Sequence, residues 1–365
     1  MPADFDGALQ GLDEMTHIGA TTRSEILQQP ELWADTLTRA EKFGFDERNF
    51  ELPLIVTGAG TSAYAAAAVA AALPNARAVP TTDLLTDYER YFNAPGILLS
   101  LARSGNSPES VAVVEKIQRT RPPVKQYAIT CNPAGQLARH SGVETLLLDP
   151  RTNDRSLVMT GSFSNLALAG IALRRLPELA SALPKIISDA DRKFAAYEAA
   201  AQRIAARGFS RAVILASGSL MGAAREAALK TLEMTAGQIA VFAETFLGLR
   251  HGPMSFLRED TLVLCFLSSS PATRRYEYDL LAELGAKKIG YIVAIAPAAN
   301  LDFVSAEQQI PALAPDLPDT LRTPFEIVFA QLLGLHLSLN AGLNPDNPSP
   351  AGIINRVVQS FRIYE

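Results

Sequence analysis

The feature that most constrains the fold of this chain is a repeated pattern of apolar segment, polar turn and helix-forming stretch. Three such units begin near residues 52, 95 and 124, and three more follow in the same order from residue 210. Gly60 in the first half corresponds to Gly218 in the second, and Ala128 to Ala294, at similar offsets of 158 and 166 residues. This agreement indicates that one α/β lobe is duplicated.

The apolar segments carry Val, Ile and Leu without strict alternation, which is typical of strands that are buried on both faces. Strands that alternate with helices predict a parallel sheet between two layers of helices, a flavodoxin-like three-layer αβα arrangement, in each lobe. We predict an N-terminal helical segment, two α/β lobes and a C-terminal tail, with the bounds 1–50, 51–185, 186–340 and 341–365.

Composition narrows the class of protein. The net charge of −5, without a basic stretch interleaved with aromatic residues, argues against nucleic-acid binding. The N-terminal stretch is acidic and lacks the apolar core of a secretory signal, and no run reaches the roughly 18 apolar residues of a membrane span. Cys131 and Cys265 suit a reducing compartment rather than a disulfide framework. These observations predict a soluble, cytoplasmic protein.

Residues 56–66, with the sequence VTGAGTSAYAA, follow an apolar strand and open an alanine-rich helix. Their glycines fit the G-x-G-x-x-A form of a dinucleotide fingerprint, and Asp83 lies near the position of its ribose-binding acid. Gly60, Thr61 and Ser62 equally suit a sugar phosphate at a helix N-terminus. A plain turn in which Ser62 caps the helix is the third interpretation.

A second turn of this kind, ARSGNSPES, follows the next strand. Ser107 is a predicted helix N-cap because Pro108, which suits the first helical position, comes directly after it. Arg103, Ser104, Asn106 and Ser107 are therefore candidate phosphate ligands, although a Ser-Pro cap without a ligand is an alternative. Since a sugar phosphate needs several converging donors, two neighbouring hydroxyl-rich turns favour it over a nicotinamide cofactor.

Glu226, Lys230 and Glu233 share one face of a predicted helix. A solvent-exposed ion-pair stripe is the simpler interpretation of this spacing. The helix starts at the carboxyl edge of the second sheet, however, where a carboxylate is a candidate proton carrier. His251 lies in a Gly-Pro turn and suits the opening of a sugar ring. No histidine pair has the spacing of a metal site, so no metal is expected.

Together these motifs resemble the sugar isomerase (SIS) domain family, in which two such lobes form one subunit. The stretches that carry the resemblance extend from about residue 57 to residue 359 and include TGAGTSA, RSGNSPESVA, GAAREAALKTLEMTAG, RHGP and NRVVQ. Within the family the chain is most similar to the tagatose-6-phosphate ketose/aldose isomerases, also described as galactosamine-6-phosphate deaminase/isomerases.

The resemblance implies roles for the motif residues. The phosphate-binding hydroxyls of the family fall on four positions, Thr61, Ser62, Ser104 and Ser107. The carboxylate that moves a proton between C1 and C2 falls on Glu233, with Glu226 and Lys230 as its polar neighbours. His251 matches the histidine that opens the ring and that reaches over from the other subunit, which implies a homodimer, or dimers paired into a tetramer.

One position departs from the family pattern. The synthase branch of the family has a C-terminal lysine that forms a Schiff base with the sugar, and Gln359 stands there instead. The expected reaction is conversion of galactosamine 6-phosphate to tagatose 6-phosphate and ammonia, or aldose–ketose interconversion, without a cofactor. Glucosamine-6-phosphate deamination, fructosamine-6-phosphate deglycation and a non-enzymatic sugar-phosphate-binding regulatory module are the alternatives.

Overall fold

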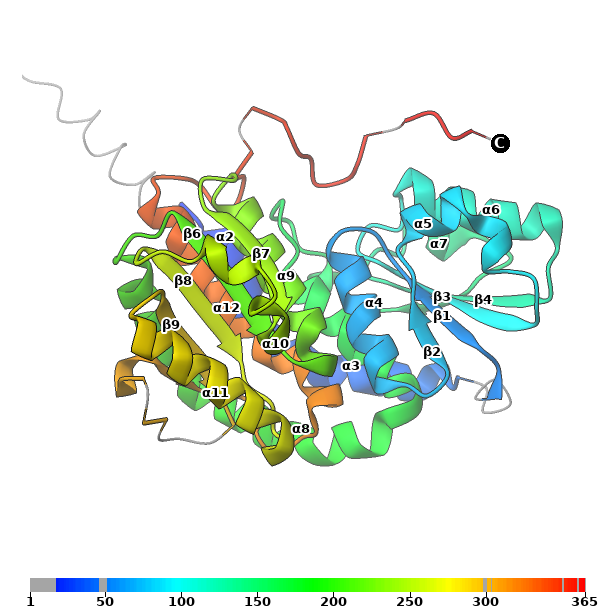
Figure 1. Ribbon diagram of the computed structural model, residues 1–365. Coiled ribbons are helices and arrows are strands. Elements are labelled where there is room, and N and C mark those ends of the chain that lie inside the picture. The colour runs from blue at the N-terminus through cyan, green and yellow to red at the C-terminus, as the bar shows by residue number, and fades with distance from the viewer. Residues whose placement is uncertain are drawn as a thin grey trace, which may run out of the picture.

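The computed structural model describes residues 18–45, 51–297, 301–302, 304–349, 351–359 and 361–364 (Figure 1). It contains two five-stranded parallel sheets. The strands of the first sheet are β1 (Leu54–Thr57), β2 (Ala76–Ala78), β3 (Gly96–Ala102), β4 (Val124–Thr130) and β5 (Glu144–Leu147). Those of the second are β6 (Arg211–Ala216), β7 (Ala240–Thr245), β8 (Thr261–Phe266), β9 (Tyr291–Ala296) and β10 (Gln309–Pro311).

Both sheets have the same topology. The first has the order β2-β1-β3-β4-β5, and the second has the order β7-β6-β8-β9-β10 when it is read from its β7 edge. Each of the paired strands runs parallel to its neighbour, in agreement with their buried, non-alternating sequences. The predicted α/β fold with two matching lobes is confirmed.

Helices cover the sheets and join the lobes. The longer ones are α2 (Ala20–Leu27), α3 (Gln29–Phe43), α4 (Thr61–Ala72), α6 (Pro108–Thr120), α8 (Gly161–Ala205), α9 (Met221–Met234), α11 (Pro271–Lys287) and α12 (Asp319–Asn340). The shorter ones are α5 (Thr81–Thr86), α7 (Gln136–Arg139) and α10 (Phe246–Leu249). Single 3₁₀ turns occur at η2 (Tyr88–Arg90), η3 (Pro150–Thr152), η4 (Gly218–Leu220), η5 (Pro253–Phe256) and η6 (Ala306–Gln308).

Helix α8 links the lobes and bends where its sequence requires it. Arg175 has non-helical dihedral angles, two residues before Pro177, whose missing N–H and ring break the regular helical pattern. The helix packs against α3 and α12 and continues through the predicted lobe boundary at residues 185 and 186. No helix in the described part of the chain is long and apolar enough to cross a membrane.

Helix α4 contacts both α8 and α9, so it lies where the lobes meet. Its sequence is mostly alanine, and glycines face it from both neighbours. A Cβ added at Gly170 would lie 2.5 Å from Cγ2 of Val69, and one added at Gly222 would lie 3.1 Å from the backbone nitrogen of Ala68. These small residues let the helix axes approach closely, and they bring the start of α4 next to the polar face of α9.

Candidate active site

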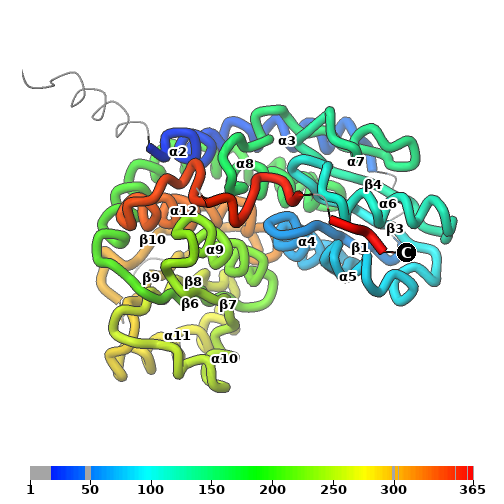
Figure 2. The backbone as a smooth tube through the Cα atoms, turned by 90° about the horizontal axis from the view of Figure 1, so that it is seen from above, coloured from blue at the N-terminus to red at the C-terminus, as the bar shows by residue number. Residues whose placement is uncertain are grey.

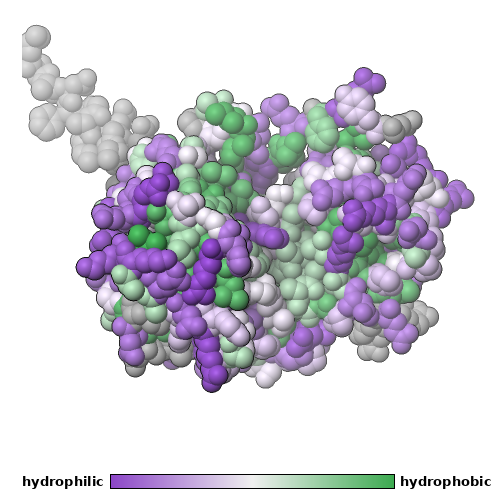
Figure 3. Space-filling model, in the orientation of Figure 1, coloured by the Kyte–Doolittle hydropathy of each residue, from purple (hydrophilic) through white to green (hydrophobic). Residues whose placement is uncertain are grey.

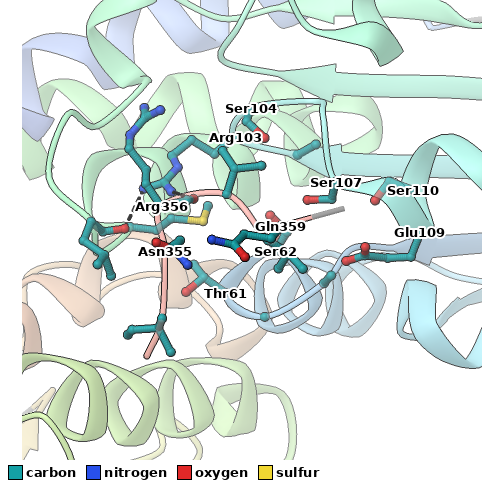
Figure 4. A pocket seen from close by; sticks show the side chains of 18 of the residues that line it. Thr61, Ser62, Arg103, Ser104, Ser107, Glu109, Ser110, Asn355, Arg356 and Gln359 are labelled. Carbon is teal, nitrogen blue, oxygen red and sulfur yellow. Dashed lines mark hydrogen bonds between the residues drawn. The ribbon is translucent and has the colours of Figure 1, made fainter. Parts of the chain in front are cut away.

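A cavity of about 630 Å³ lies at the carboxyl ends of β1 and β3 (Figure 4). These neighbouring strands flank the point where the strand order reverses, the usual ligand site of such sheets. Its walls come from the β1–α4 turn, the β3–α6 turn, the segment before α8, Glu233 on α9 and the C-terminal tail. Residues from both lobes therefore meet in one cavity.

The β1–α4 turn supplies the first pair of hydroxyls. Gly60 has φ 56° and ψ −130°, a conformation suited to glycine, and the helix begins at the next residue, Thr61. Gly58 must also lack a side chain, because a Cβ there would lie 2.5 Å from the carbonyl oxygen of Ser62. Gly60, Thr61 and Ser62 all line the cavity. The cap position belongs to Gly60, so the interpretation of Ser62 as the N-cap is wrong.

The β3–α6 turn supplies the second pair. Gly105 has φ 66°, and Ser107 is the N-cap of α6 with Pro108 at the first helical position, as predicted. The Ser107 side chain makes no capping hydrogen bond, and Ser104 and Ser107 both line the cavity. Their hydroxyls thus face the same space as those of the first turn (Figure 4).

Two other predicted phosphate ligands have protein partners. The Asn106 side chain accepts a hydrogen bond from the backbone N–H of Gln136 at 3.0 Å and lies outside the cavity. The buried Arg103 guanidinium lines the cavity, but it donates to the carbonyl oxygens of Leu157, at 3.0 Å, and Arg356. Burial, and then the nearby Arg356, lower the pKa of Arg103.

Glu226, Lys230 and Glu233 form a connected chain of titratable groups. The Thr61 hydroxyl donates to Oε1 of Glu226 at 3.2 Å, and the Lys230 ammonium lies 3.5 Å from the same oxygen. Lys230 also donates to Oε2 of Glu233, which lines the cavity. Glu226 and Lys230 are fully buried, so the interpretation as a solvent-exposed stripe is wrong. Only Glu233 keeps part of its side chain accessible.

Burial and the neighbouring charges shift the pKa values of Glu226 and Lys230. Burial raises the pKa of Glu226 to about 8, an effect that Lys230 opposes and Glu233 reinforces. Burial acts to lower the pKa of Lys230, but the two carboxylates outweigh it and raise that pKa overall. Lys230 therefore stays an ammonium at neutral pH and donates to Glu233, the member of the chain that faces the cavity.

The protonation of Glu226 gives a pH-dependent contribution to stability. Its pKa rises from an ordinary 4.5 to about 8 on folding, so the native state holds this proton more tightly than the unfolded state. The resulting stabilisation is complete below the unfolded pKa and is lost as pH rises through the folded pKa. We expect Glu226→Gln to flatten the fall in Tm between about pH 5 and about pH 9. Glu41→Gln, on an exposed site, is the control, and parallel Tm profiles for Glu226→Gln and the parent would contradict this.

His251 and Gln359 differ in their placement. His251 follows α10 in an exposed turn, and it does not line the cavity. Gln359, by contrast, lines the cavity from the tail, as Ser62 does from the start of α4 (Figure 4). One described chain thus assembles every predicted site residue in or directly behind the cavity except Asn106 and His251.

The cavity also contains polar residues that the sequence interpretation missed. Glu109 is buried, and its Oε2 has no hydrogen-bond partner among the described residues. Ser110 and Arg356 line the cavity as well. Glu109 and Ser110 follow Pro108 in the first turn of α6. The predicted start of this helix could therefore have indicated both residues as part of the site. The tail around Arg356 has no regular helical or strand pattern, and although Arg356 lies in the NRVVQ stretch of the family resemblance, no role was predicted for it.

Comparison with known proteins identifies the family. The D-galactosamine-6-phosphate deaminase AgaS of Escherichia coli is 37% identical over 378 residues, which cover 95% of this chain and 96% of that protein. The chain belongs to the AgaS family. No protein-family model matches it.

Solved structures agree with the AgaS assignment. A Clostridium novyi protein superposes with a TM-score of 0.87 at 31% identity and covers 96% of both chains. The tagatose-6-phosphate ketose/aldose isomerase from Escherichia coli superposes with a TM-score of 0.79 at 35% identity, over 92% of this chain and 96% of that one. The two-lobed architecture of this AgaS-family chain is therefore one that phosphosugar enzymes share.

Proposed function

We propose that this chain is a phosphosugar deaminase/isomerase that converts galactosamine 6-phosphate to tagatose 6-phosphate and ammonia. The observation that carries the proposal is the position of Glu233, at the wall of a hydroxyl-lined cavity and hydrogen-bonded to the buried Lys230. The Escherichia coli relative is named for deamination of that substrate, and the matched structure is named for the ketose/aldose reaction.

In the proposed binding mode the hydroxyls of both turns hold the 6-phosphate. Thr61 and Ser62 come from the start of α4, and Ser104 and Ser107 come from the β3–α6 turn. The backbone N–H groups and dipoles at both helix starts favour the same anion. The reacting end of the open-chain sugar then lies toward Glu233.

The proposed chemistry needs one carboxylate that moves a proton. Glu233 takes the proton from C2 of the open-chain amino aldose, which gives a C1–C2 enolamine. The same carboxyl group returns the proton to C1, and a second proton passes from the amine nitrogen to O1, so that C1 becomes a hydroxymethyl group and C2 an imine. Water adds to C2, and ammonia leaves to give the 2-ketose. The Lys230 ammonium holds the Glu233 carboxylate in place through these steps.

Removal of one phosphate-binding hydroxyl tests the proposed binding mode of the 6-phosphate. Ser62→Ala is expected to raise KM by about 10-fold or more, because a hydrogen bond to a charged group contributes about 1.5–3 kcal/mol. Steady-state kinetics with galactosamine 6-phosphate measure this, and Ser24→Ala, on the exposed surface of α2, is the matched control. An unchanged KM for Ser62→Ala would remove this side chain from the phosphate site.

The substrate is tested by release of ammonia and ketose from a panel of sugar phosphates. Turnover of galactosamine 6-phosphate with a higher kcat/KM than glucosamine 6-phosphate supports the proposal. Equal or greater turnover of glucosamine 6-phosphate, or of a fructosamine 6-phosphate, would replace the proposed substrate. Binding without turnover of any compound would overturn the enzymatic assignment of Glu233.

We also propose that the working enzyme is a cytoplasmic homodimer with shared active sites. His251 lies outside the cavity of its own chain. Two large apolar side chains of the second lobe are exposed, Leu232 on α9 and Leu247 on α10, the helix that precedes His251. Leu232 borders a groove together with Tyr64 and Phe242. A second copy seated on this surface would cover them and bring its His251 toward Glu233.

A further inference from the structure

The described part of the C-terminal tail, residues 351–359 and 361–364, crosses from the end of α12 in the second lobe to α6 in the first (Figure 2). Its residues from Gly352 to Gln359, together with Phe361, form one wall of the cavity. Farther on, Ile363 and Tyr364 border a separate groove along α6. The tail therefore spans both lobes and closes the cavity between them.

Apolar burial does not explain how the tail is held. Ile353, Val358 and Phe361 are 86%, 53% and 49% exposed. The space-filling view shows apolar surface on the segment that crosses the top of the molecule (Figure 3). Exposed apolar side chains contribute little to docking the tail within one chain, so polar contacts must fix its position.

The polar contacts converge on Arg356. Its Nε donates to the carbonyl oxygen of Asp154 at 2.9 Å, and its Nη2 donates to Oδ1 of Asn153 at 2.7 Å. In return, its own carbonyl oxygen accepts a hydrogen bond from the Arg103 guanidinium. Arg103 also holds the carbonyl oxygen of Leu157. Arg356 is thus the residue where the tail, the β3–α6 turn and the segment before α8 are joined.

The segment before α8, which accepts the hydrogen bonds of Arg356, is itself held by several hydrogen bonds. The Asp154 carboxylate accepts hydrogen bonds from the backbone N–H groups of Thr160, Gly161 and Ser162, at 2.8, 3.1 and 2.9 Å, at the start of α8. The buried Glu25 carboxylate accepts from the N–H groups of the two residues that follow Asp154. The segment whose carbonyl oxygens Arg356 binds is therefore held by hydrogen bonds that do not involve the tail.

We infer that Arg356 is a positioning residue that holds the tail as one wall of the active-site cavity and keeps Gln359 in that wall. A guanidinium suits this task because its planar set of donors can bind the carbonyl oxygens of Asn153 and Asp154 and the amide oxygen of Asn153 at once. The effect on catalysis rests on the proposed function, whereas the effect on the tail does not. The two are tested by separate measurements.

The position of the tail is measured by labelling a single cysteine. Cys131 and Cys265 are fully buried, so a thiol reagent in the folded protein reports only on a cysteine introduced at Val357, which is half-buried against the cavity. We expect Arg356→Ala to raise the labelling rate by about tenfold or more, the equivalent of one lost charge-assisted hydrogen bond. Arg362→Ala, an exposed arginine of the same tail, is the control. Equal rates in Arg356→Ala and its parent would overturn the inference.

The catalytic consequence is measured by a double-mutant cycle. Gln359→Ala should impair kcat/KM in the parent chain but add nothing in the Arg356→Ala background, because Gln359 is then already out of place. Arg356→Lys should restore part of the loss. Additive losses would show that Arg356 does not act through Gln359. If no variant or parent turned over any sugar phosphate, the proposed function would fail while the labelling experiment still decided the role of Arg356.

Discussion

Replacing Glu233 with glutamine is expected to lower the rate of ammonia release by about 10²–10⁴-fold and to leave substrate binding nearly unchanged. The amide has almost the shape of the carboxyl group, so the cavity and the contact with Lys230 persist. It cannot accept the C2 proton, however, and the enolamine does not form. The loss should therefore appear in kcat far more than in KM.

Exchange of the C2 hydrogen with deuterated water separates proton transfer from the later hydrolysis of the imine. Glu233→Gln should abolish this exchange, whereas Glu41→Gln, an exposed residue on α3, should exchange like the parent. Retained exchange in Glu233→Gln would assign the proton transfer to another group. Glu109 would then be the next candidate, because it is buried and lines the same cavity.

Local sequence was enough to predict the elements that carry the phosphate site. The strand β3 is buried at every position, so its sequence shows no alternation. The turn after it contains Gly105 at positive φ and a Ser-Pro helix start, both of which have local physical causes. The repeat of this unit then predicted two matching sheets, and the shared strand order confirmed them.

Contacts between distant segments could not be predicted in this way. The charges of Glu226 and Lys230 have the spacing of a surface stripe, and they are buried because two helices from other parts of the chain, α4 and α12, pack against α9. Arg103 was predicted as a phosphate ligand because it lies in the same turn as Ser104. Its hydrogen bonds instead go to the carbonyl oxygens of Leu157 and of Arg356, which is 253 residues away. No local pattern encodes which carbonyl groups a side chain meets after folding.

The second large effect concerns His251. His251→Asn is expected to lower kcat/KM by about 100-fold or more with cyclic substrate, because asparagine cannot exchange the proton that ring opening requires. The exposed position of His251, outside the cavity of its own chain, predicts that it serves the active site of a second chain. The single variant cannot distinguish this from a role within one chain, but a mixture of two inactive variants can.

In a heterodimer of Glu233→Gln and His251→Asn chains, one site combines both defects and the other has neither if the histidine acts across the interface. Random exchange of subunits in an equal mixture should then restore about one quarter of the parent activity, because half of the dimers are mixed and each has one intact site. If His251 acted within its own chain, every site would keep one defect and no activity would return. Heterodimers purified with two different affinity tags decide between these outcomes, since their activity should be half that of the parent or close to zero.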